Sequence, residues 1–192
     1  KSHFLEVAYL LINGQLPSAA QLAEFVHAIQ YHTMINESLL RFFNGFHYNA
    51  HPMAMVSAVV SSMAAFYHDS MDNNNPRHRE IFAHRILAKI PTVSAAAFKH
   101  MLGQPFVYPR NDLDYCANML NMFFAVPAED YVVDPMAAEA LDLLLMLHAD
   151  HEQNASTSTV RLAGSTGTNP YAAISAGVSA LWGPAHGGAN EA

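Results

Sequence analysis

Helix-start signals recur along residues 1–192, and the apolar residues between them follow helical spacing rather than the alternation of a strand. Asn75-Pro76 and Asp134-Pro135 each place a capping side chain before a proline that suits the first helical turn. The run 53–67 consists mainly of Met, Ala, Val and Ser, with almost no polar face, which is typical of a buried helix. We therefore predict an all-α fold of many closely packed, buried helices with short connections and no domain linker.

Caps and breaks set the boundaries of the expected helices. Pro91 is taken as a break, because proline lacks the N–H that continues a helix. The expected helices span 4–12, 18–30, 37–46, 53–67, 77–90, 92–102, 112–124, 135–150, 155–164 and 170–182, and 189–192 looks like the first turn of another.

Composition narrows the class of partner. Charged residues make up only 13% of the chain and hydrophobic residues 52%, which suits buried helices. The net charge of −7, without a Lys/Arg block, argues against nucleic acid and anionic membranes as partners. The single cysteine, Cys116, excludes an intrachain disulfide and fits a reducing cytoplasm. Because the sequence begins at Lys1 and stops inside an apparent helix, we expect a fragment of a longer chain.

His186 lies between Gly183-Pro184 and Gly187-Gly188. Proline fixes the backbone and glycine permits a close approach, so this sequence holds an imidazole on a defined turn. A following helix N-terminus would disfavour the imidazolium, and a neutral imidazole can polarise a carbonyl while an enolate forms. The alternative is an ordinary Gly/Pro turn without chemistry.

A polar segment, His148 to Asn154, follows the apolar helix 135–150, which we expect to be buried. His148 and His151 with Asp150 or Glu152 would suit a metal site, although the spacing is not that of a zinc protease. An anionic-substrate site that uses one histidine as a donor is a second interpretation. A polar helix terminus that caps carbonyls is the third.

Two further patterns have more than one interpretation. Arg85 and Lys89 form an i, i+4 cation pair within the helix that follows Asn75. Such a basic face is usually solvated, but the two charges repel each other unless an anion or carboxylate lies between them.

Segments 154–159 and 172–177 are rich in small residues. Their helices should therefore approach closely, at the centre of the fold or at a subunit contact. Ordinary core packing is also consistent with this composition.

Residues 183–192 (GPAHGGANEA) and 148–157 (HADHEQNAST) together resemble citrate synthase, specifically the bacterial type II enzymes. Segments 68–70, 74–80 and 103–112 carry the same resemblance. It implies the large helical domain of that family, with the small domain and the rest of the active site downstream. It also implies condensation of acetyl-CoA with oxaloacetate and water to citrate and CoA, no required cofactor or metal, a dimer or hexamer, and a bacterial cytoplasm.

The resemblance assigns roles by matching position. His186 would hydrogen-bond the thioester carbonyl, His151 would bind oxaloacetate with Asn154 as a further candidate, and His148 would be structural. An NADH-inhibition site would comprise His32, Thr33, Met34, Tyr67, Arg85 and Lys89. Ala128 stands where some regulated members carry a reactive cysteine. The alternatives are 2-methylcitrate synthase, which uses propionyl-CoA, and a non-catalytic helical scaffold that senses NADH.

Overall fold

The computed structural model describes residues 2–149 and 153–191, and every regular element within these ranges is a helix, as predicted. The α-helices are α1 (Phe4–Asn13), α2 (Ala19–Gln30), α3 (Glu37–Phe42), α4 (Pro52–Ser62), α5 (Pro76–Met101), α6 (Tyr115–Phe124), α7 (Pro135–Ala149), α8 (Ala155–Ser165), α9 (Pro170–Leu181) and α10 (Gly188–Glu191). Three short 3₁₀ turns, η1 (Phe43–Gly45), η2 (Met63–Ala65) and η3 (His68–Ser70), connect some of them.

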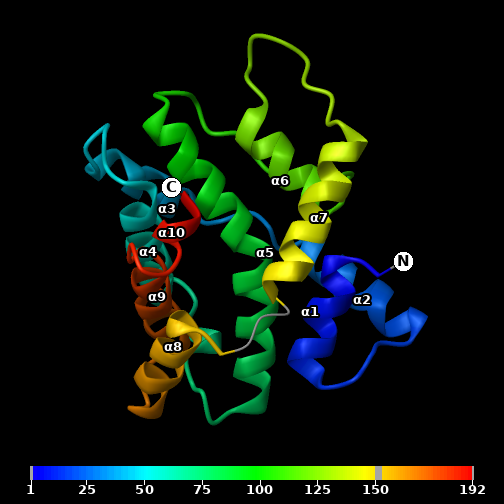
Figure 1. Ribbon diagram of the computed structural model, residues 1–192, viewed down its shortest axis with the longest axis vertical. Helices are drawn as coiled ribbons and strands as arrows, with labels where there is room; N and C mark the ends of the chain where they lie inside the picture. Colours follow the sequence, from blue (N-terminus) through cyan, green and yellow to red (C-terminus); the bar gives the residue numbers. More distant parts are fainter. Residues whose placement is uncertain (1, 150–152, 192) are drawn as a thin grey trace.

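The long helix α5 runs through the middle of the molecule (Figure 1). Helices α1, α2 and α7 lie on one side of it, and α3, α4, α8 and α9 lie on the other. The main core joins α3 and η1 to α4, α5 and α9 through residues such as Phe43, Val59, Val93 and Tyr171, all fully buried. A second cluster joins α1 and α2 to α5, and a third joins α6 to α7. Helix α5 is therefore the scaffold on which both sides of the molecule are built.

The predicted caps explain where several helices begin. The Asn75 side chain accepts hydrogen bonds from the first backbone N–H groups of α5, and Asp134 Oδ1 accepts from the Met136 N–H at the start of α7. Helix α6 begins at Tyr115 with Asp114 as its cap, three residues later than expected. The predicted break at Pro91 is wrong: α5 continues through it. Pro91 is buried, and burial of the residues on both sides of it offsets the lost backbone hydrogen bond.

Helix α7 is less buried than its apolar composition predicts. Leu143, Leu144 and Leu147 are 48%, 52% and 57% exposed, and Ala138 is the buried member of this helix among the described residues. Helix α8 has no buried residue, so of the two places expected for it, the centre of the fold is excluded and a subunit contact stays a prediction. No described helix combines the length and the hydropathy that a membrane crossing requires.

Candidate functional site

The turn that carries His186 is tightly closed by its own backbone. The His186 and Gly188 N–H groups both donate to the Gly183 carbonyl, at 2.9 and 3.2 Å. A Cβ on Gly187 would lie 2.3 Å from the Leu181 carbonyl oxygen and 2.8 Å from Leu181 Cδ1. No side chain fits there unless the backbone moves, so the glycine is a geometric requirement of this turn. The prediction that the sequence around His186 forms a defined turn is confirmed for the backbone.

Ser156 determines which ring nitrogen of His186 remains for a ligand. Its Oγ lies 2.8 Å from His186 Nε2, and the serine belongs to the first turn of α8, thirty residues earlier in the chain. His186 is half-buried. With Nε2 engaged, Nδ1 is the nitrogen that can meet a ligand. We did not predict Ser156 as a site residue; the small-residue character of 154–159 was the signal that its helix approaches another closely.

The close approach of α8 and α9 holds Ser156 against the turn. A Cβ on Gly177 in α9 would lie 2.4 Å from Val160 Cγ2 and 3.4 Å from the Ser156 carbonyl oxygen. Helix α9 is fixed in turn to α4, where Ser57 Oγ lies 3.0 Å from Ser175 Oγ and 2.9 Å from Ser179 Oγ. The predicted close packing of the small-residue helices is confirmed, and it positions two elements of one site.

The C-terminal end of α9 is also anchored by an aromatic contact. The Trp182 ring stacks on the His51 ring with centroids 4.8 Å apart, and the His51 Nδ1 accepts from the Met53 N–H at the start of α4. Because Trp182 directly precedes Gly183, this stack fixes the entry to the turn.

The polar segment before α8 is only partly described. Asn154 caps α8, since its Oδ1 accepts from the Thr157 N–H at 2.9 Å. His148 Nδ1 lies 2.7 Å from the Leu144 carbonyl oxygen of its own helix. His151, with Asp150 and Glu152, lies outside the described residues, so the predicted oxaloacetate role of His151 and the metal interpretation stay predictions. The described ranges contain no group of three or more His, Cys, Asp or Glu side chains arranged to hold a metal ion.

The structure brings the six residues of the predicted NADH site together. Lys89 Nζ donates to the carbonyl oxygen of His32 at 2.6 Å and also to that of Met34, and Thr92 Oγ1 donates to the carbonyl of Thr33. These bonds fasten the segment after α2 to α5. Burial, together with the nearby Arg85 charge, lowers the pKa of Lys89 to about 8.

Tyr67 completes this group, which we call the Tyr67 cluster: His32, Thr33, Met34, Tyr67, Arg85 and Lys89. The Arg85 guanidinium carbon lies 4.5 Å from the Tyr67 ring centroid, and Lys89 Nζ lies 5.5 Å from it. Arg85 also binds the Asp69 carboxylate through two nitrogens, at 2.6 and 3.0 Å. A carboxylate therefore pairs with Arg85, whereas Lys89 is held by backbone carbonyls, so the two cations have separate partners.

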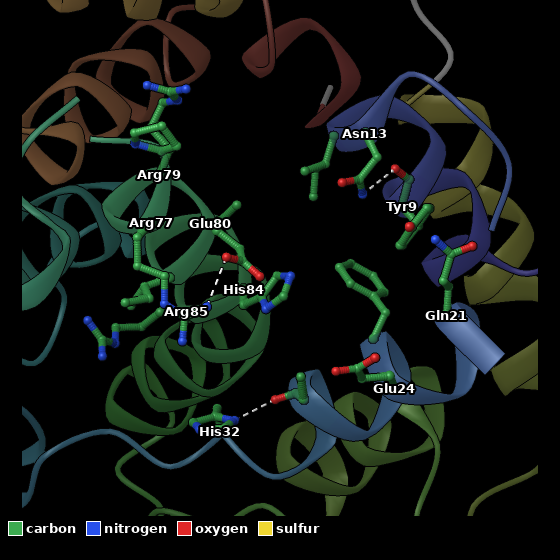
Figure 2. A pocket seen from close by; sticks show the side chains of 16 residues that line it. Tyr9, Asn13, Gln21, Glu24, His32, Arg77, Arg79, Glu80, His84 and Arg85 are labelled. Atoms are coloured by element: carbon green, nitrogen blue, oxygen red, sulfur yellow. Dashed lines mark hydrogen bonds and ion pairs between the residues drawn. The ribbon is translucent and has the colours of Figure 1, made fainter. Parts of the chain in front are cut away.

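A cavity of about 860 Å³ separates α1 and α2 from the N-terminal half of α5 (Figure 2). Its polar side chains carry both signs of charge, because Glu24 and Glu80 line it together with the arginines of α5. Glu24 on α2 faces Glu80 and His84 on α5. Burial lowers the pKa of His84, so this histidine favours its neutral form. His32 and Arg85 also line the cavity, so it borders the Tyr67 cluster.

Solved structures of helical condensing enzymes share this fold. Citrate synthase from Pyrobaculum aerophilum is 31% identical with a TM-score of 0.87, over 99% of this chain and 48% of that one. The ternary complex of carboxymethyl coenzyme A and oxaloacetate with citrate synthase from Thermoplasma acidophilum is 26% identical, with the same TM-score and coverage. Citrate synthase from Thermotoga maritima is 27% identical with a TM-score of 0.81, over 100% of this chain and 48% of that one.

These likenesses define the class as an all-helical domain of the citrate synthase type, and this chain spans about half the length of the structures it matches. A family model described as "Citrate synthase, C-terminal domain" matches residues 1–192. The chain belongs to the citrate synthase family.

Proposed function

We propose that this chain belongs to a citrate synthase of the bacterial type II subclass, which condenses acetyl-CoA with oxaloacetate and water to citrate and CoA. The observation that carries the proposal is the contact between Ser156 on α8 and His186, which lies in a turn that only glycine can close. Family membership supplies the reaction class. The ligands named for the Thermoplasma acidophilum enzyme, oxaloacetate and a CoA derivative, support the same two substrate classes here.

The geometry supports a defined role for each ring nitrogen of His186. If the Ser156 hydroxyl donates to Nε2, the single proton of the neutral imidazole lies on Nδ1. Nδ1 then donates to the thioester carbonyl oxygen of acetyl-CoA while a base removes a proton from the methyl carbon. The negative charge that develops on that oxygen is met by a donor already in place, so little reorganisation is needed during the reaction.

Oxaloacetate would accept the resulting carbon nucleophile at its ketone. His151 is the proposed ligand for this substrate. The Asn154 side chain can contribute its amide nitrogen as a donor while its Oδ1 caps α8. We further propose that the reaction needs no metal or organic cofactor and that the protein self-associates as a dimer or hexamer.

We also propose that NADH inhibits this enzyme by binding at the Tyr67 cluster. Support comes from the convergence of its six residues from three separate segments of the chain around one aromatic ring and two cations. A ring with two adjacent cations suits a ligand that combines phosphates with aromatic bases.

The test is release of the CoA thiol from acetyl-CoA plus oxaloacetate by the intact protein, with and without EDTA. We expect turnover that EDTA does not change, and a loss of about 10²-fold or more in His186→Ala, the size expected when a donor to a developing oxyanion is removed. His47→Ala, an exposed histidine in a loop, is the matched control and should retain full activity.

Two other outcomes would redirect the assignment. Faster turnover with propionyl-CoA than with acetyl-CoA would indicate a 2-methylcitrate synthase. No turnover with either thioester, while NADH still binds, would indicate a non-catalytic scaffold and would overturn the proposed reaction.

A further inference from the structure

The guanidinium of Arg85 is already occupied by a carboxylate of this chain. Its Nη1 and Nη2 donate to the two Asp69 oxygens at 2.6 and 3.0 Å, and Nη1 also donates to Ser70 Oγ at 2.8 Å. The Arg85 side chain is 17% exposed and that of Asp69 is 60% exposed. The cation is thus fixed in the protein, whereas the carboxylate lies on the solvent side of the pair.

Lys89 is engaged in a different way. Its ammonium group donates to the backbone carbonyls of His32 and Met34, and the residue is only 6% exposed. It can turn towards a ligand only by releasing the segment that follows α2. Arg85 is therefore the member of the Tyr67 cluster that an incoming phosphate can engage by exchanging one partner, without breaking a connection between helices.

The surroundings of Arg85 favour such an exchange. Ser70 is fully buried and is held by Tyr171, whose hydroxyl lies 2.8 Å from Ser70 Oγ, so the inner side of the guanidinium keeps its partner. Asp69 lies on the single-turn η3 and reaches the guanidinium from outside. A carboxylate and a phosphate bind a guanidinium in the same two-pronged geometry, so each can replace the other.

We propose that Asp69 competes with a ligand phosphate for the guanidinium of Arg85. This competition weakens dinucleotide binding at the Tyr67 cluster and restricts the cluster to ligands that displace a carboxylate. The inference rests on the proposed NADH site and specifies how its affinity is set. The hydrogen bonds from Arg85, together with its charge, lower the pKa of Asp69, so the competing carboxylate stays ionised at neutral pH.

The test is equilibrium binding of NADH to the intact protein, followed by NADH fluorescence, for wild type, Asp69→Asn and Asp72→Asn. The Asp69 substitution keeps the shape of the side chain and removes the charge that competes. We expect it to lower the Kd for NADH by about 3- to 10-fold, the range for loss of a partly exposed two-pronged ion pair. Asp72→Asn removes the same charge three residues away, where the carboxylate accepts from the Asn74 N–H, and should change the Kd less than twofold.

The outcomes separate this inference from the proposed site. Wild-type binding with an unchanged or raised Kd in Asp69→Asn overturns the competition and leaves the NADH site standing. An equal fall in the Kd for NADH in Asp69→Asn and Asp72→Asn shows a general effect of charge and also overturns the competition. No NADH binding by any of the three proteins overturns the site and the competitor together.

A second measurement does not depend on the folding of a variant. A crystal structure of the wild-type protein with NADH should show Arg85 bound to a phosphate and parted from Asp69. An intact Arg85–Asp69 pair in that complex would contradict the proposal.

Discussion

Gly187→Ala tests whether the closed turn positions His186 for catalysis. The new Cβ would lie 2.3 Å from the Leu181 carbonyl oxygen, whereas an ordinary contact of this kind is at least about 3.2 Å, so the backbone beside His186 must shift by roughly 1 Å. The clash is with backbone and cannot be relieved by rotation of a side chain. A displacement of ~1 Å at a catalytic group costs about 10²-fold in rate. We therefore expect kcat to fall about 10²-fold in the CoA-thiol assay.

Gly164→Ala is the matched control for this substitution. Gly164 lies in α8, the helix that carries Ser156, and an added Cβ there would meet nothing within 4 Å. It should leave kcat unchanged and raise stability by about 0.5–1 kcal/mol, because alanine loses less backbone entropy than glycine in a helix. If Gly187→Ala kept kcat within threefold of wild type, the closed turn would not be what positions His186 for catalysis.

Three further predictions follow from the packing and the buried charges. In α9, Gly177→Ala should lower the free energy of unfolding by about 1–3 kcal/mol in a urea titration, because its Cβ would overlap Val160 Cγ2. Adding Val160→Ala should restore most of the lost stability, and no restoration would show that the strain lies elsewhere. Burial lowers the pKa of Lys89 from 10.5 in the unfolded chain to about 8, so the unfolded state binds more protons between these values. The unfolding free energy of wild type relative to Lys89→Met should therefore rise with pH between about 8 and 10.5, at most ~1.4 kcal/mol per pH unit, and a flat difference would be contrary to this account. Burial and the neighbouring Asp142 raise the pKa of the Cys116 thiol to about 12. A thiol reagent should therefore label Cys116 slowly in the folded protein and quickly in urea. Rapid labelling of the native state would show that Cys116 is accessible.

The sequence predicted helix starts well where one local signal decides them. Asn75 and Asp134 cap their helices in the structure because the cap depends on a few adjacent residues. Pro91 was misjudged because its effect depends on tertiary packing: the helix continues where the residues around the proline are buried. The apolar composition of α7 predicted burial that the described structure does not show.

The candidate site was predicted in the same uneven way. His186 was identified from the Gly/Pro pattern around it, because the restriction on the backbone is local. Ser156 was missed, because its role arises from a contact between residues thirty positions apart. The Tyr67 cluster was assembled through the family resemblance, and periodicity could not have joined His32 to Arg85. Asp69 was not predicted as a partner of Arg85, since its place at the cluster depends on how η3 lies against α5.

The most direct test of the central claim is a double-mutant cycle between Ser156 and His186 in the CoA-thiol assay. Ser156→Ala alone should reduce kcat/KM by about 3- to 10-fold, the value of one hydrogen bond that orients the imidazole. Ser165→Ala, an exposed serine of the same helix, should have no effect. If Ser156 acts only through His186, the double variant Ser156→Ala/His186→Ala will be as active as His186→Ala alone. Losses that multiply in the double variant would contradict the proposed coupling, and full activity in His186→Ala would contradict the proposed role of this histidine.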